Sequence, residues 1–231
     1  MRSTAVRYLL RSMLLGDIPQ VMEIERQSFP TIWPQTAYKR ELRNRLARYL
    51  VVTEPPRDEA PEPAQSPEPP EPSRQGFWTG LRRLLGAEPE SPPTRELIVG
   101  SLGLWLMVGQ GHIVTIAVRE SHRRRGIGEW MLIAALNLAI QEEQETVTLE
   151  YRRSNLAARA LYAKYGFTEI GVRRRYYSDN HEDAVIMTTP PILTPQYQDL
   201  LRDLSEGHRR RWSHLYGTDS QMMRRLPRPA D

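Results

Sequence analysis

Cysteine is absent from the 231 residues of this chain. That absence excludes disulfide bridges, zinc sites built on cysteine and a covalent thioester on the enzyme. No apolar run reaches the length of about 20 residues that a membrane-spanning helix needs. The apolar stretch near the N-terminus is interrupted by Arg11 and leads into Asp17-Ile18-Pro19, which is typical of a helix start. We therefore expect a structured domain there rather than a targeting peptide, and a cytoplasmic location.

Apolar residues are also scarce, at 39% of the chain, whereas prolines number 19. Residues 54–95 contain 11 of these prolines, together with many glutamates and serines. Such a composition buries too little apolar surface to offset the entropy of ordering. We predict a disordered insertion at 54–95, inside a single domain made of residues 1–53 and 96–190. Within the insertion, residues 77–85 are apolar and basic, which fits a short helix touching a partner or membrane surface, or one lying on its own domain.

Residues 191–231 form a basic C-terminal extension of this domain. From Leu201 onward it has seven arginines against four acidic residues, with Trp212 and Tyr216 between them. A basic and aromatic tail can stack on RNA. The alternatives are a partly helical tail that docks on its own protein and a tail that is simply solvated. The chain as a whole carries a formal charge of +4, which fits a protein that meets polyanions.

A basic, glycine-containing loop stands at the centre of the chain. The apolar residues 113–118 predict a buried strand, and Arg123-Arg124-Arg125 then precede Gly126 and Gly128 at the start of an apolar helical stretch. Glycines let backbone N–H groups approach an anion, and the helix dipole adds partial positive charge there. The loop therefore suits phosphate groups, although its glycine spacing alone is equally compatible with an ordinary turn carrying solvated arginines.

The remaining pattern predicts a mixed α/β sheet, because a meander of strands is followed by alternating strands and helices. Strands are predicted at residues 6–13, 49–52, 98–107, 111–118, 146–151, 167–176 and 184–188. Helices are predicted after Asp17, at 36–46, from the glycine loop to about residue 143, and from Asn155 to Gly166. Residues 109–111 read as the turn of a hairpin.

The loop matches the pattern [R/Q]-x-x-G-x-G/A as Arg123-x-x-Gly126-x-Gly128. In this respect the chain resembles the GCN5-related N-acetyltransferases (GNAT), and from His112 to Met187 it resembles their RimI type, the ribosomal-protein alanine acetyltransferases. The stretches that carry the resemblance are residues 113–118, 123–128, 149–155, 160–167, 175–177 and 182–184, with 17–19, 23–25, 28–30 and 103–105 in the N-terminal half.

This resemblance implies a GNAT fold, in which helices flank a mixed, mostly antiparallel central sheet, and acetyl-CoA as cosubstrate without a metal. The residues it assigns to acetyl-CoA are Arg123, Arg124, Arg125, Gly126, Ile127 and Gly128 of the loop, Ile116, Ala117 and Val118 of the preceding strand, and Asn155. Asn155 is also placed to cap the helix that follows it.

Two further side chains are expected to carry the chemistry. Glu150 lies near the carboxyl end of a strand, the edge at which α/β sheets usually bind ligands. Tyr162 lies on the following helix, from which its hydroxyl can reach the same cleft. The residues alone leave two other readings open: Glu150 as a charge on an exposed edge, and Tyr162 as a core aromatic. The resemblance assigns Glu150 as general base, through a water, and Tyr162 as general acid.

The two histidines near the loop are given no chemical role by the sequence. His112, at the start of a strand, is expected to be structural, and His122 is expected to be exposed.

The resemblance also implies an acceptor, the α-amine of the N-terminal alanine of a small-subunit ribosomal protein. Basic residues behind that alanine would call for acidic groups in the groove. The candidates are Glu25, Glu182 and Asp183, with Trp33, Tyr176 and Tyr177 as walls. Tyr151-Arg152-Arg153 is bulkier and more basic than this family's usual run before Ser-Asn. Two alternatives therefore stay open: a lysine or small-molecule amine acetyltransferase, and a non-catalytic acetyl-CoA-binding, ribosome-associated module.

Overall fold

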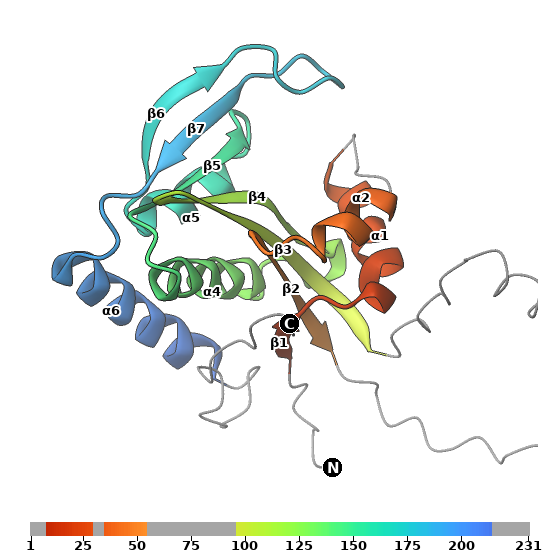
Figure 1. Cartoon of the computed structure of the whole chain (residues 1–231), viewed down its shortest axis with the longest axis horizontal. Coiled ribbons are helices and arrows are strands. Elements are labelled where there is room, and N and C mark those ends of the chain that lie inside the picture. Colours follow the sequence, from red (N-terminus) through yellow and green to blue (C-terminus); the bar gives the residue numbers. More distant parts are fainter. Residues whose placement is uncertain (1–7, 30–34, 55–95, 214–231) are drawn as a thin grey trace, which may run out of the picture.

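The computed structural model describes residues 8–29, 35–54 and 96–213. These residues build a seven-stranded sheet with the strand order β1-β2-β3-β4-β5-β7-β6 (Figure 1). The strands are β1 (Leu9–Ser12), β2 (Ala47–Glu54), β3 (Leu97–Met107), β4 (Gln110–Val118), β5 (Thr146–Arg152), β6 (Thr168–Arg173) and β7 (Ala184–Thr188). The helices are α1 (Ile18–Ser28), α2 (Gln35–Glu41), α4 (Ile127–Gln141), α5 (Leu156–Lys164) and α6 (Pro195–Trp212), with short 3₁₀ turns at Leu15–Asp17 and Glu120–His122.

Five of the six strand pairs are antiparallel, and β4 and β5 form the parallel pair. A parallel pair needs a crossover, and α4 supplies it. The fold is thus the mixed, mostly antiparallel sheet flanked by helices that the sequence predicted.

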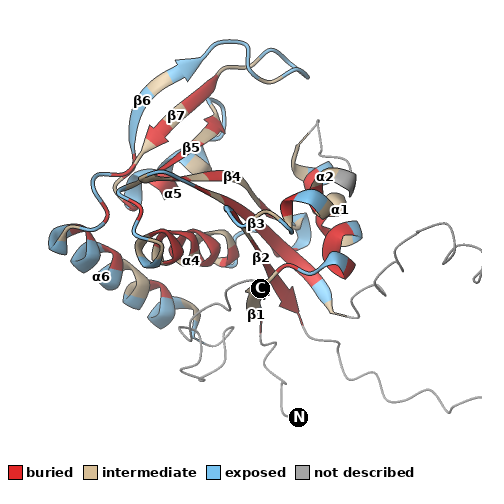
Figure 2. Cartoon of the chain, in the orientation of Figure 1, coloured by how far each residue is buried: buried red, intermediate tan, exposed pale blue. Residues whose placement is uncertain are grey.

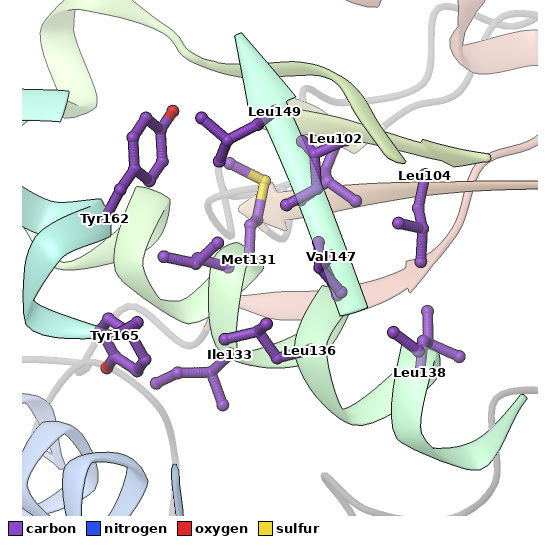
Figure 3. Packing of buried hydrophobic residues seen from close by; sticks show 14 of the residues in the cluster. Leu102, Leu104, Met131, Ile133, Leu136, Leu138, Val147, Leu149, Tyr162 and Tyr165 are labelled. Atoms are coloured by element: carbon purple, nitrogen blue, oxygen red, sulfur yellow. The ribbon is translucent and has the colours of Figure 1, made fainter. Parts of the chain in front are cut away.

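The two faces of the sheet carry separate apolar cores because side chains alternate along each strand. On β2, Leu50 and Val52 pack in the core that contains α4, whereas Tyr49 and Val51 pack in the core that contains α1. Helix α4 is buried over most of its length (Figure 2). Its Met131, Ile133 and Leu136 lie in the same cluster as residues of β3 and β5 (Figure 3). Within the described ranges, no helix is long and apolar enough to cross a membrane.

The start of the domain differs in detail from its prediction. Of the strand expected at 6–13, the structure has Leu9–Ser12, and residues 1–7 lie outside the described ranges. Asp17 does precede α1, but its side chain makes no capping bond to that helix. The buried Asp17 carboxylate instead accepts hydrogen bonds from the Arg11 guanidinium and from the backbone N–H of Leu14. It therefore ties the strand to the turn before the helix.

Two predicted elements are shorter than expected for local reasons. Helix α2 ends at Glu41 rather than residue 46, because Asn44 turns the chain into β2 by accepting a bond from the N–H of Leu46. Strand β6 ends at Arg173, since Arg175 adopts a left-handed φ of 53° that a strand cannot contain.

The two predicted additions to the domain are described to different extents. Strand β2 continues through Glu54, one residue into the segment expected to be disordered, and pairs directly with β3. Residues 55–95, which connect these strands, lie outside the described residues. In the C-terminal extension, residues 195–212 form α6, which lies beside α4 (Figure 1). Of the alternatives for this extension, the structure shows a helix docked on its own domain, while RNA contact stays a prediction.

Candidate functional site

The site lies next to a bulge in strand β4. Gly103 pairs with Thr115 and Leu104 with Ile113, so Val114 is an extra residue on β4. A bulge bends a strand and increases its twist. Gly103 makes room for it, because a Cβ there would lie 2.6 Å from the Tyr49 ring and 2.9 Å from the Val114 side chain.

Beyond the bulge, β4 leaves its parallel neighbour. The two strands pair only from Gln110 opposite Thr146 to Ile113 opposite Leu149. A cleft of about 860 Å³ lies where they part. Ile116 lines it, in the stretch of β4 that the resemblance assigns to acetyl-CoA. The two strands are therefore separated along the cleft.

The cleft collects predicted residues from distant parts of the chain. It is lined by Glu150 of β5, Asn155 and Tyr162 around α5, Glu25 of α1, and Tyr176 and Tyr177 of the loop before β7. Four segments thus meet near the carboxyl end of β5. Trp33, the other predicted wall, lies outside the described residues.

Glu150 is held by two cationic or polar side chains. Its Oε2 lies 3.2 Å from His112 Nε2, and its Oε1 lies 3.0 Å from an Arg173 guanidinium nitrogen. The hydrogen bond from His112 is the main reason that the pKa of Glu150 lies below its usual value, with the charges of His112 and Arg173 adding to it and burial opposing it. Glu150 is therefore an ionised carboxylate at neutral pH.

His112, like Arg173, is a residue of the site to which the sequence assigns no chemical role. Its Nε2 faces Glu150 and its Nδ1 lies 2.9 Å from Thr148 Oγ1, so the imidazole ring is held at both of its nitrogens. The parallel register explains the meeting: His112 pairs with Thr148, and Glu150 lies two residues further on the same face. Only a knowledge of the strand pairing could have shown this.

Tyr162 is buried between two aromatic rings. Its ring lies edge-on to Tyr151 at 6.0 Å between centroids and 5.9 Å from Phe167. Figure 3 shows its hydroxyl pointing away from Met131 and the core around α4. Burial raises the pKa of this hydroxyl above its ordinary value, so it keeps its proton at neutral pH. Asn155 caps the same helix, because its side-chain oxygen accepts from the Ala158 N–H at 3.1 Å.

The three predicted acids lie in different surroundings. Glu25 is buried in the cleft, where Thr115 Oγ1 donates to it at 3.0 Å and burial raises its pKa. Glu182 accepts from the Ser154 N–H at 2.6 Å, and Asp183 accepts from the Arg175 N–H at 2.9 Å. These two acids fasten the loop before β7 and do not line the cleft. Their contact with an acceptor stays a prediction.

The glycine loop leads into α4 through a left-handed turn. Gly126 has φ 78°, and its carbonyl accepts the first backbone bond of the helix, from the Trp130 N–H. The backbone N–H groups of residues 127–129 come before this first bond, so, as at the start of any helix, they have no acceptor within the helix. Arg123, Arg124 and Arg125 are exposed beside them. Backbone donors and arginines are the groups that bind pyrophosphate, so this loop fits the phosphates of coenzyme A.

The strand before the loop closes against it. Val118 contacts the position of Gly128, where a Cβ would lie 3.6 Å from a Val118 methyl group, and its carbonyl accepts from Arg123 Nε. Ala117 is buried in the core beneath α1. His122, expected to be exposed, is in fact buried, because its Nε2 lies 2.9 Å from a Glu54 oxygen at the end of β2. Among the described side chains, no group of three or more His, Cys, Asp or Glu residues could hold a metal ion.

Comparison with known proteins gives consistent matches. Residues 18–167 match the acetyltransferase (GNAT) family. A Bacillus subtilis protein, provisionally assigned as a ribosomal protein bS18-alanine N-acetyltransferase, is 29% identical over 179 residues, which are 77% of this chain and 92% of the relative. The N-alpha-acetyltransferase of Sulfurisphaera tokodaii is 32% identical over 185 residues, which are 79% of this chain and 93% of the relative. The crystal structure of the ribosomal-protein-S18-alanine N-acetyltransferase from Escherichia coli shares the fold, with a TM-score of 0.57 and 21% identity over 80% of this chain and 94% of that one.

Proposed function

This chain belongs to the acetyltransferase (GNAT) family and is an acyltransferase, and we propose that it transfers the acetyl group of acetyl-CoA to the α-amine of a protein N-terminus. The proposed acceptor is the N-terminal alanine of a small-subunit ribosomal protein. Relatives named for bS18-alanine acetylation and for N-alpha acetylation, each matched over more than three quarters of this chain, support it. A ribosomal acceptor would place the reaction in the cytoplasm.

The observation that carries this proposal is the meeting of Glu150 and Tyr162 in one cleft at the point where β4 and β5 part. The Glu150 carboxylate can accept a proton, and the Tyr162 hydroxyl can donate one. Direct transfer from a thioester to an amine needs both, and it needs no covalent intermediate on the enzyme. Such a reaction is compatible with a chain that has no cysteine.

The proposed route for acetyl-CoA follows the loop and the parted strand. Its pyrophosphate would lie at residues 123–128, and its pantetheine arm along Ile116 to Val118 with Asn155 nearby. When bound there, it supplies an activated acetyl group. The backbone of β4 beyond the bulge faces β5 without pairing to it, so its donors can polarise a carbonyl placed in the cleft.

Glu150 is proposed to take the proton of the attacking amine. A carboxylate with a lowered pKa is a weak base, but the nitrogen becomes strongly acidic once its bond to the acetyl carbon forms. Glu150 can therefore accept this proton, through a water, as the C–N bond forms. His112 and Arg173 keep it ionised and orient it.

Tyr162 is proposed to donate its proton to the thiolate that departs when the C–S bond breaks. Its pKa is raised by burial, so the hydroxyl is protonated at neutral pH and ready to act as an acid. The tyrosinate is then neutralised from solvent. Glu25, which is buried in the cleft that Tyr176 and Tyr177 also line, is proposed to face the incoming N-terminus.

Thiol release from acetyl-CoA tests this function, with matched peptides that differ in the first residue and in blocking of the α-amine. We expect turnover with a free N-terminal alanine, none after blocking, and turnover lower by about 10²–10⁴-fold in Glu150→Gln. Turnover that survives blocking would move the acceptor to lysine side chains. Acetyl-CoA binding without turnover on any amine would indicate a binding module instead.

A further inference from the structure

The C-terminal helix α6 is built into the domain. Thr194 caps its first turn by accepting from the Tyr197 N–H, and the Tyr197 hydroxyl donates to the Tyr165 carbonyl at 2.9 Å. Tyr197 and Leu201 are both buried in the core that contains α4. The helix then runs alongside α4 toward its N-terminus (Figure 1). Its position is therefore fixed by packing along its length.

The last turns of α6 reach the glycine loop. His208 is 5% exposed, and its Nε2 lies 3.0 Å from the Gly126 carbonyl oxygen. The same oxygen accepts the first backbone bond of α4, from Trp130 at 2.9 Å. His208 is thus a second donor to the peptide group that starts α4, and it comes from a different helix.

Trp212 lies against the same glycine, one turn further along α6. A Cβ added to Gly126 would lie 2.6 Å from Trp212 Nε1, 2.7 Å from Cε2 and 2.8 Å from Cδ1. The indole therefore covers the α-carbon of Gly126 at van der Waals contact. Gly126 is also left-handed, with φ 78°. Two independent conditions, its backbone conformation and the tryptophan against it, require glycine at this place.

We propose that His208 and Trp212 are positioning residues for the loop at 123–128, which is proposed to bind the phosphates of acetyl-CoA. By fixing the peptide and the α-carbon of Gly126, α6 holds the following N–H groups, at residues 127–129, in the direction that a pyrophosphate requires. The inference rests on the proposed function, in which this loop binds acetyl-CoA. It gives the C-terminal extension, which lies outside the family match at residues 18–167, a part in cosubstrate binding.

A loop that is already held in its binding conformation loses less conformational entropy when the ligand binds. Removing the hold should therefore weaken cosubstrate binding without touching the reacting groups. In the full-length chain we expect Trp212→Ala to raise the Kd for coenzyme A by about tenfold, measured by calorimetry. The kcat at saturating acetyl-CoA and the KM for the peptide should stay within about twofold of wild type.

Hydrogen exchange of the ligand-free protein gives a readout that does not depend on activity. The amides of residues 127–130 should exchange faster in Trp212→Ala and in His208→Ala. His208→Gln, whose amide N–H can reach the Gly126 carbonyl, should restore much of the protection. Because these variants keep α6 anchored through Tyr197, the effect should stay local to the loop.

Tyr197→Phe is the matched control, since it removes a bond that docks the other end of α6. It should lower the melting temperature and leave the Kd for coenzyme A unchanged. An equal loss of affinity in Tyr197→Phe and Trp212→Ala would overturn the proposal, because the effect would then be general loosening. Tighter binding in Trp212→Ala would also overturn it, and would make the indole an obstacle to the phosphates.

The outcomes separate this inference from the function on which it rests. Wild-type protein that does not bind coenzyme A at all would overturn both. Wild-type binding with unchanged Kd and unchanged exchange in Trp212→Ala and His208→Ala would overturn the positioning role alone.

Discussion

The two halves of the site are made in different ways. On the side proposed to bind the acceptor, the cleft is formed by side chains from separate segments, and His112 and Arg173 lower the pKa of Glu150 between them. On the side proposed to bind the cosubstrate, the loop at 123–128 offers backbone groups whose direction is set by one left-handed glycine. Side chains that act together in a reaction depend on a backbone that holds their positions. A site made of backbone groups is instead disturbed by a new side chain close to it. The two halves should therefore fail in different ways.

The largest effect is expected from Glu150→Gln, on the acceptor side. Loss of a general base typically costs about 10²–10⁴ in rate. The Kd for coenzyme A should not change, because the loop is untouched. Stopped-flow or steady-state thiol release would measure kcat, and calorimetry would measure the Kd. A comparable loss in both quantities would show that the two halves are not separate.

Gly126→Ala should produce the opposite division. Alanine is strained at φ 78° by about 1–3 kcal/mol, and its Cβ meets the Trp212 ring. Affinity for coenzyme A should fall by about tenfold or more, since 1.4 kcal/mol is a factor of ten. The kcat at saturating acetyl-CoA should be nearly retained. Gly126→Ala combined with Trp212→Ala should recover part of the stability, as measured by thermal unfolding, because the clash is removed while the strain remains.

The pH dependence sharpens the acceptor side. Because the pKa of Glu150 lies below its usual value, this carboxylate is already ionised throughout the neutral range. The acid limb of kcat/KM should therefore follow the α-amine of the peptide, near pH 8. His112→Gln should lower kcat modestly and leave that limb where it is. A limb that moves in His112→Gln would assign the titration to the enzyme.

The same lowered pKa has a consequence for stability. A carboxyl group whose pKa falls on folding contributes stability above its unfolded pKa, near 4.5, and loses that contribution as the pH falls through its folded value. The difference in unfolding free energy between wild type and Arg173→Gln should accordingly be present at neutral pH and shrink in acid. Urea titrations at pH 7 and at pH 3 would measure it. A difference that stays constant between the two would contradict the ion pair as its cause.

The smallest effect is expected from Glu25→Gln. The change keeps the shape of a buried side chain and its contact with Thr115. It should raise the KM for a peptide with basic residues by a few-fold and leave the KM for acetyl-CoA unchanged. Equal changes in both KM values would exclude Glu25 from acceptor binding. Asp183→Asn is a useful comparison, because its carboxylate accepts from the Arg175 backbone and does not line the cleft.

Much of the secondary structure of this protein can be predicted from local patterns in the sequence. The period of the apolar residues predicted the strands and α4, and the spacing of Gly126 and Gly128 after three arginines predicted the loop. These features depend on residues that are close together in the sequence, which explains why the sequence alone predicts them. Glu150 and Tyr162 were also named, although their place in one cleft required β5 and α5 to be folded together.

What the tertiary structure decided is the set of contacts between distant segments. His112 faces Glu150 only because β4 and β5 are parallel in one register, and His122 is buried only because β2 ends beside it. Glu182 and Asp183 hold the loop before β7 because folding brings the backbone N–H groups of Ser154 and Arg175 next to them. The sequence by itself predicted most of the strands and helices of the domain and the glycine loop, since both follow from local backbone preference and apolar period. The partners of each charged side chain, and the docking of Trp212 on Gly126, depended on strand register and helix packing that no local pattern contains.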